Sequence, residues 1–251
     1  MATSKARLFI LDDVTPLGIR ADRILDFFGR DPSVSVLRSD RLAAELIKKV
    51  PGEDTLVPIA YGGLIAFALL RREGLPGDFG GYLIAKRAYE WSENDRRQIP
   101  RVIECSAVDI APFGSRVNIL DDIVASGLTM NVCIQKFYGR VNGVSAFVVS
   151  SVVSRDDRYR TLEGSTIPEA DNLYASMSVA GTNGRPAIYS LRYLLEKAKY
   201  VESDLTRFVQ RYIIGDKEEF RKLMLETEEP GPLRLLRKSP AEFLERYSKK
   251  L

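Results

Sequence analysis

The 251-residue sequence contains no histidine. Without an imidazole, the chain cannot form a histidine metal site, a serine–histidine catalytic triad or a histidine general base. Any chemistry must therefore use carboxylates, amines, guanidinium groups, tyrosine, backbone amides or a bound metal ion. Cysteine is almost as scarce, and Cys105 and Cys133 both lie among apolar residues. That setting favours buried free thiols over a disulfide or a metal site.

Long apolar runs and strong net charge are also missing. No apolar stretch reaches the ~18 residues of a membrane-spanning helix, and no apolar signal core begins the chain. The 37 basic and 34 acidic residues leave a net charge of +3, too little to indicate nucleic acid as a partner. We therefore expect a cytoplasmic protein that binds neither membrane nor nucleic acid. Its length suffices for one large domain, or for a core with a smaller subdomain.

Between residues 55 and 153, apolar segments of strand length alternate with segments of helical periodicity. This alternation predicts an α/β fold with a mostly parallel central sheet flanked by helices. Strands are expected at 55–60, 80–87, 101–108, from 117 and at 144–153, and helices at 64–73 and 129–138. Elsewhere we expect a short strand or turn at 8–13, helices at 19–28, 41–50, 189–212 and 217–225, an irregular segment at 167–177, a break at 230–232 and a helix from Pro240.

Residues 117–129 combine the features of a phosphate-binding site. A mostly apolar strand ends in Asp121 and Asp122, and a loop of small residues then leads into a helix. Ligands of open α/β sheets bind outside the carboxyl ends of strands, and a helix N-terminus directs N–H groups at an anion. Ser126 and Thr129 add hydroxyl donors, while the acids can accept sugar hydroxyls or hold a divalent metal through water. The stretch predicts a sugar phosphate ligand; the alternative is an unrelated α/β strand, receiver-like or flavodoxin-like, that ends in two acids by chance.

These residues resemble the phosphoribosyl-pyrophosphate (PRPP) signature of the type I phosphoribosyltransferases. That signature has four apolar residues, two acids, two apolar residues and a small-Ser/Thr-Gly-x-Thr loop, and Asn118 departs from it where an apolar residue is usual. The resemblance implies the family's α/β core with a hood subdomain built from N- and C-terminal parts. The corresponding boundaries are residues 1–39 for an N-terminal segment of the hood, 40–158 for the core and 159–251 for a mostly helical region that completes the hood.

The resemblance also implies an activity. Members of the family transfer the 5-phosphoribosyl group from PRPP to a nucleobase-like acceptor in nucleotide metabolism and salvage, and release pyrophosphate with Mg²⁺ as cofactor. A non-catalytic regulator that senses PRPP or a nucleotide is the alternative. Dimers are common in the family, so a homodimer is a further expectation, but no motif in the chain identifies the acceptor base.

The family's site residues carry over position by position. Asp121 and Asp122 would act as the catalytic and metal-binding acids, contacting the ribose hydroxyls directly or through Mg²⁺. The 5-phosphate would be held by Ala125, Ser126, Gly127, Leu128 and Thr129. The pyrophosphate would be held by Tyr61, Gly62, Gly63, Lys86 and Arg87. Tyr61 departs from the Lys or Arg that often precedes the glycines, a Gly-Gly turn is common in any α/β protein, and the two cations also fit a solvated strand end.

The polar residues 88–100 lack periodicity and predict a loop. The family has a mobile loop here that closes over the site and excludes water. Arg96 and Arg97 would then reach the pyrophosphate as catalytic residues, whereas Tyr89 and Trp91 fit either a lid or packing.

Two other charged segments carry alternatives. Asp12 and Asp13 follow an apolar run, as in a receiver-type phosphorylation pocket, but no Ser-Gly-x-Thr loop follows them. We expect them to be structural, with a receiver-type or phosphatase-like protein as the rival. Arg155 and Arg158 lie where relatives often bind the base, although a charged turn explains them equally well.

Overall fold

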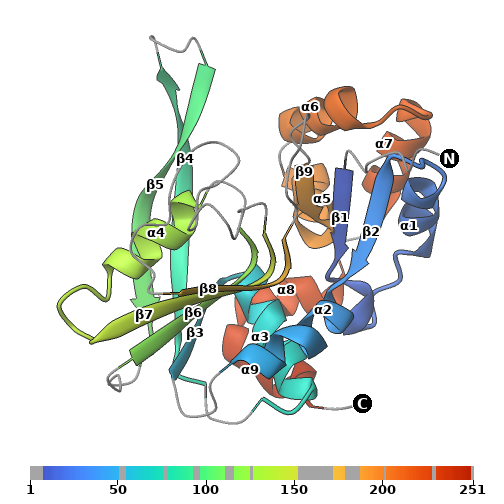
Figure 1. Cartoon of the computed structure of the whole chain (residues 1–251). Coiled ribbons are helices and arrows are strands. Elements are labelled where there is room, and N and C mark those ends of the chain that lie inside the picture. The colour runs from blue at the N-terminus through green and yellow to red at the C-terminus, as the bar shows by residue number, and fades with distance from the viewer. Residues whose placement is uncertain are drawn as a thin grey trace, which may run out of the picture.

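The computed structural model of the chain contains two β-sheets and the helices that pack on them (Figure 1). It describes residues 8–50, 55–75, 79–92, 97–110, 116–124, 127–151, 172–178, 187–200, 202–227 and 230–249. In the part of the chain so described, no helix is both long and apolar enough to cross a membrane.

The larger sheet has the strand order β5-β4-β3-β6-β7-β8. Its strands are β3 (Thr55–Ala60), β4 (Tyr82–Ser92), β5 (Arg97–Val108), β6 (Arg116–Val124), β7 (Gly143–Ser151) and β8 (Asn172–Ser178). Neighbouring strands run parallel, except that β5 pairs antiparallel with β4. The expected α/β fold with a mostly parallel central sheet is thus confirmed.

Successive side chains along β6 point to opposite faces of this sheet, and each face packs against a different helix. Val117 and Ile119 pack with α4 (Leu128–Gln135), whereas Leu120 packs with α3 (Gly62–Arg72) on the opposite face. The helices α2 (Ser39–Leu46), α8 (Gly231–Lys238) and α9 (Pro240–Tyr247) gather on the α3 side in Figure 1. On the α4 side, Cys105 and Cys133 are buried free thiols, as expected, with their Sγ atoms 3.7 Å apart.

The smaller sheet, called here the small sheet, has the order β2-β1-β9 with both pairs parallel. It joins two N-terminal strands, β1 (Leu8–Asp12) and β2 (Val34–Arg38), to the C-terminal β9 (Ala187–Ser190). The helices α1 (Asp22–Gly29), α5 (Leu191–Tyr200), α6 (Glu202–Tyr212) and α7 (Lys217–Glu226) surround it (Figure 1). N- and C-terminal segments therefore build one unit, as the fold prediction had it, while the exact domain boundaries stay a prediction.

The prediction of a loop at residues 88–100 is wrong. β4 continues to Ser92 and β5 begins at Arg97, and the two strands pair from Tyr82↔Val108 to Ser92↔Arg97. Figure 1 shows this hairpin rising beyond the body of the molecule. A two-stranded ribbon satisfies its backbone by pairing with itself, so its sequence needs no alternating apolar face to form strands.

Three C-terminal predictions also need correction. The segment expected to be irregular contains β8. The single helix expected at 189–212 is two helices, α5 and α6, and the first begins only at Leu191 because the preceding residues form β9. The expected break at residues 230–232 is instead the start of α8, since proline is tolerated in the first turn of a helix. The other predicted helices are present with ends shifted by a few residues; the one expected at 41–50 is α2 followed by a 3-10 turn.

Candidate functional site

The two acids of the 117–129 stretch lie near the carboxyl end of β6, in the middle of the larger sheet. Asp121 and Asp122 are buried, with 7% and 8% of their surfaces exposed. The Asp122 amide donates to Asp121 Oδ1 at 2.9 Å, and the Ile123 amide donates to Asp122 Oδ1 at 2.7 Å. The strand runs on to Val124, two residues further than the pattern suggested. The acids are therefore held by the strand itself, just before the predicted phosphate loop.

The turn between β3 and α3 packs directly against these acids. A Cβ atom on Gly62 would lie 2.1 Å from Asp122 Cγ, and one on Gly63 would lie 2.3 Å from the Leu120 carbonyl oxygen. Only glycine permits such a close approach at either position. Tyr61, which precedes them, is half-buried and is joined to Ala60 by a cis peptide bond. The structure thus brings the predicted pyrophosphate turn and the predicted ribose acids together.

The end of the signature loop forms the N-terminus of α4. Gly127 has a φ of 74°, a left-handed conformation that favours glycine, and its carbonyl accepts the Asn131 amide at 2.9 Å. Leu128 begins the helix and Thr129 is buried in its first turn. Backbone N–H groups at such a terminus have no partner within the helix and can bind an anion. Ala125 and Ser126 lie outside the described residues.

Arg192 is part of this site, although no motif in the sequence marks it. It lies in the first turn of α5, directly after β9, and is 8% exposed. Its guanidinium contacts three carboxylates: Asp122 Oδ2 at 3.3 Å, Glu196 Oε2 at 3.0 Å and Asp13 Oδ2 at 3.6 Å. Burial by itself would lower the pKa of Arg192, but the charges of Glu196, Asp122 and Asp13 together raise it above its usual value. The small sheet is therefore tied to the acid pair by an ion-pair cluster.

Asp13 is the second unexpected member of the cluster. It is fully buried, and its carboxylate accepts hydrogen bonds from the Ser190 hydroxyl at 2.7 Å and from the Arg192 amide at 3.0 Å. Burial raises the pKa of Asp13 to about 6, the nearby charge of Asp122 adds to this, and Arg192 opposes it. The expectation of a purely structural Asp12-Asp13 pair thus misses the contact that Asp13 makes with the site.

Asp12, by contrast, serves the turn that follows it. Its Oδ1 accepts the Thr15 amide at 2.9 Å, and its carbonyl accepts the Ser39 hydroxyl at 2.8 Å. Arg38 Nε lies 3.6 Å from Asp12 Oδ2. These contacts fasten β1 to a short 3-10 helix and to α2.

Of the lysine and arginine residues predicted to bind the ligand, the structure describes the side chain of Lys86 but not those of the arginines. Lys86 follows the β4 residues that pair with the end of β3, and its exposed ammonium bonds Glu104 Oε2 at 2.7 Å. That hydrogen bond, with one from Ser106, holds the pKa of Glu104 below its usual value. The side chains of Arg87 and Arg97 lie outside the described part of the structure, as do residues Arg96, Arg155 and Arg158.

A divalent cation would find two protein carboxylates here. Among the described residues, no group of three or more His, Cys, Asp or Glu side chains could hold a metal ion. Mg²⁺ in phosphate-transfer sites is commonly bound by one or two carboxylates together with substrate phosphates and water. Asp121 and Asp122 fit that donor set, and the ligand itself would have to complete it.

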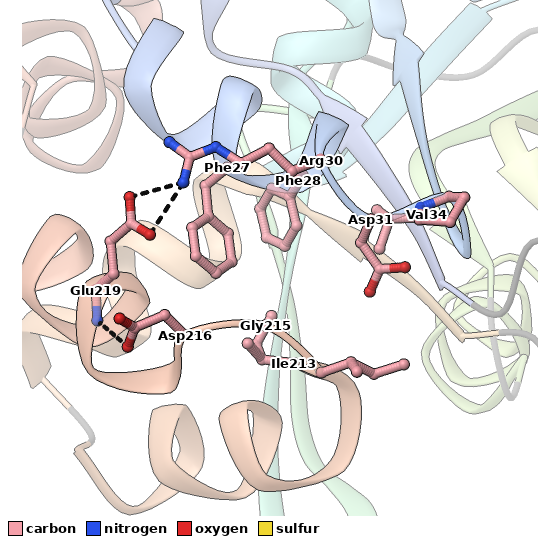
Figure 2. Close-up of a pocket in the computed structure, with 11 residues that line it drawn as sticks. Phe27, Phe28, Arg30, Asp31, Val34, Ile213, Gly215, Asp216 and Glu219 are labelled. Atoms are coloured by element: carbon pink, nitrogen blue, oxygen red, sulfur yellow. Dashed lines mark hydrogen bonds and ion pairs between the residues drawn. The ribbon is translucent and has the colours of Figure 1, made fainter.

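A separate cavity of about 390 Å³ lies between α1 and the turn that joins α6 to α7 (Figure 2). Phe27 and Phe28 form part of its wall, and Arg30 pairs with Glu219 at 3.0 Å on its rim. Of the described residues that line it, none belongs to the candidate site. The cavity is thus a feature of the small-sheet unit and not of the acid pair.

Comparisons with known proteins give only distant structural similarities. No family model and no curated protein sequence matches the chain. Similar solved structures include a hypothetical protein from Neisseria gonorrhoeae with bound ppGpp, at 17% identity over 74% of this chain and 90% of that one, with a TM-score of 0.41. They also include a purine phosphoribosyltransferase from Pyrococcus horikoshii, at 17% identity over 60% and 86% of the two chains, with a TM-score of 0.36.

A hypoxanthine phosphoribosyltransferase from Staphylococcus aureus is similar at 17% identity over 57% of this chain and 72% of that one, with a TM-score of 0.36. Similarity at this level is distant and concerns only the arrangement of helices and strands.

Proposed function

We propose that the chain is a phosphoribosyltransferase, which moves the 5-phosphoribosyl group from PRPP to a nucleobase-like acceptor and releases pyrophosphate. The observation that carries the proposal is the contact between Gly62 and Asp122, which sets the N-terminus of α3 against two buried carboxylates. The N-terminus of α4 follows the same carboxylates along the chain. Two anion-binding helix ends on either side of two hydroxyl acceptors suit a sugar that carries phosphate at both ends.

The proposed roles follow from that arrangement. Asp121 and Asp122 accept the ribose hydroxyls, and residues 125–129 hold the 5-phosphate. The turn at Tyr61, Gly62 and Gly63, with Lys86 and Arg87, holds the pyrophosphate. Arg96 and Arg97 would approach the pyrophosphate, and Arg155 and Arg158 would face the acceptor. The small sheet, with residues 1–39 and 159–251, would cover the acceptor as the hood.

The chemistry needs electrostatics more than proton transfer. When the bond between the anomeric carbon and pyrophosphate breaks, positive charge develops on the ribose and negative charge on the leaving group. The carboxylates of Asp121 and Asp122 would stabilise the first, and helix N–H groups with Lys86 would stabilise the second. When bound, Mg²⁺ would supply further charge neutralisation to the pyrophosphate. None of these roles requires a histidine.

The experiment is to replace both acids, Asp121→Asn with Asp122→Asn, and to measure PRPP binding by calorimetry and pyrophosphate release with a panel of nucleobases. We expect both to be lost, because amides cannot offer the same acceptors to the ribose hydroxyls or to Mg²⁺. Glu45→Gln, which neutralises an exposed carboxylate on α2, is the matched control and should change neither. Retention of both signals in the double variant would refute the site.

A regulator that senses PRPP or a nucleotide is the second candidate. The observation that favours it is the ion pair between Asp122 and Arg192, which already engages one of the two acids. The same nucleobase panel separates the two functions: binding of PRPP without pyrophosphate release for any base would indicate a sensor. Release with even one base would indicate the enzyme.

A further inference from the structure

We propose that Arg192 is a positioning residue that reaches from the small-sheet unit to fix the carboxylate of Asp122, with Asp13 as its anchor. The inference rests on the proposed function, because it concerns the acid assigned to a ribose hydroxyl. Arg192 contacts the ligand only through Asp122 and is not itself assigned a catalytic role.

The first support is the number of elements that meet at Arg192. Its guanidinium joins Asp13 at the end of β1, Asp122 on β6 and Glu196 one turn along α5. Its own amide donates to Asp13 Oδ1, so both its backbone and its side chain are fastened to the small sheet. The planar fork of an arginine has five N–H donors and can serve several carboxylates at once, which a lysine ammonium cannot do with the same geometry.

The second support is how Asp122 is confined. Its Oδ1 accepts the Ile123 amide, its Oδ2 accepts Arg192 Nη2 at 3.3 Å, and Gly62 lies directly against its Cγ. A carboxylate has about four acceptor positions, and these two bonds constrain its plane. A side chain held in one rotamer before the ligand arrives costs less to order when it binds.

The third support is the free-energy cost of joining two units through a buried charge cluster. Burying a guanidinium among three carboxylates removes charges from water, and apolar residues of similar size would often stabilise such an interface as well or better. Within the part of the chain that the structure describes, Arg237 on α8 adds a second cation to the cluster, 3.6 Å from Glu196 Oε1. The contact of the buried Arg192 with Asp122 has a specific function if Arg192 orients the Asp122 carboxylate.

The test compares Arg192→Lys with Arg237→Lys, a matched change in the other arginine that pairs with Glu196. Affinity for PRPP with Mg²⁺ is measured by calorimetry, and folding is checked by thermal unfolding. We expect Arg192→Lys to weaken binding about tenfold, the size typical of a lost hydrogen bond between charged groups, and Arg237→Lys to stay within about twofold. Unchanged binding in Arg192→Lys would overturn the proposal, and tighter binding would mean that Arg192 competes with the ligand for Asp122.

Asp13→Asn provides a variant that alters Arg192 from its far side with almost no change of shape. We expect it to weaken PRPP binding about threefold in the wild-type background and to add nothing in the Arg192→Lys background, because both changes act through one guanidinium. Additive effects would overturn the anchor. The measurement of Asp13→Asn in the wild-type background also serves if Arg192→Lys fails to fold.

Hydrogen exchange of the Ile123 amide separates this inference from the proposed function. That amide donates to Asp122 Oδ1, so its protection reports on the position of the carboxylate without any ligand. We expect Arg192→Lys to speed its exchange and Arg237→Lys to leave it unchanged. If wild-type protein binds no PRPP, the proposed function fails; if the Ile123 amide exchanges equally in all variants, the positioning role fails.

Discussion

Two Asp-Asp pairs in this chain end apolar strands, and they have different surroundings. Asp12 and Asp13 end the central strand of the small sheet, while Asp121 and Asp122 lie near the end of a central strand of the larger sheet. All four side chains are buried. What differs is the segment that follows each pair. A single 3-10 turn at Thr15–Leu17 follows the first, and a glycine turn into an eight-residue helix follows the second.

The difference teaches that the acids do not make a ligand site by themselves. Asp12 is used by its own turn, and Asp13 is turned toward Arg192 and Ser190. Asp122 instead has a glycine against it and two helix N-termini nearby. Arg192 joins the two pairs, so that the first supports the second.

The largest effect should come from giving both pairs the same substitution. We expect Asp122→Ala to weaken PRPP binding at least about a hundredfold, because a charge-assisted acceptor for ribose and Mg²⁺ is lost. Asp12→Ala should leave the affinity unchanged and lower the free energy of unfolding by about 1–3 kcal/mol, because the Thr15 amide loses its acceptor. Calorimetry and urea unfolding measure the two quantities. Equal loss of affinity in both variants would erase the distinction between the pairs.

The next effect concerns pH and the buried Asp13. Its pKa is about 6 in the folded chain against 3.8 for an ordinary aspartate, so between these values the folded state holds the proton more tightly than the unfolded state. Its stabilising contribution is therefore complete below about pH 4 and is lost as the pH rises through 6. Asp13→Asn removes this dependence.

We expect the free energy of unfolding of Asp13→Asn, relative to wild type, to rise by about 2 kcal/mol between pH 4 and pH 7. Urea unfolding at several pH values measures it. Asp26→Asn, on the exposed side of α1, is the control and should show no such trend. A flat difference for Asp13→Asn would mean that Asp13 titrates normally.

Local patterns in the sequence were enough for the central strands β3, β6 and β7, for the helices α3 and α4, and for the segment around Asp121. Each of those depends on residues close together in the chain. The β4–β5 hairpin depends on pairing of one strand with another, and its polar sequence carries no period that would show it. The short β9 takes its strand form from β1, which lies far away in sequence.

The contact of Arg192 with Asp122 spans 70 positions and exists only because the two sheets pack as they do. No motif marks Arg192, and it lies in a segment that reads only as part of a helix. The one available signal was the Asp12-Asp13 pair. Its similarity to the Asp121-Asp122 pair was visible in the sequence, but its contact with Arg192 was not.

A smaller effect should distinguish the glycines beside the two pairs. Gly62→Ala would place a methyl group on Asp122, whereas Gly18→Ala, after the first pair, meets no atom within 4 Å and only strains a φ of 77°. We expect Gly62→Ala to lower the free energy of unfolding by about 1–3 kcal/mol and to reduce PRPP affinity, and Gly18→Ala to cost about 1 kcal/mol with unchanged affinity. Thermal unfolding and calorimetry check both. Normal PRPP binding in Gly62→Ala would show that the α3 turn does not take part in the site.

The smallest effect should come from the exposed pair between Lys86 and Glu104 at 2.7 Å. Exposed ion pairs contribute little to stability because water screens them, so Glu104→Gln should leave the free energy of unfolding nearly unchanged. It should, however, release Lys86 to a pyrophosphate, so we expect PRPP affinity to rise about twofold and that gain to shrink at high salt, where exposed charges are screened. Lys86→Gln should lower the affinity by a similar factor. Calorimetry at two salt concentrations measures both affinities. A fall in affinity for Glu104→Gln would place Lys86 outside the site. The acid pair and the two helix N-termini would then bind the ligand without Lys86.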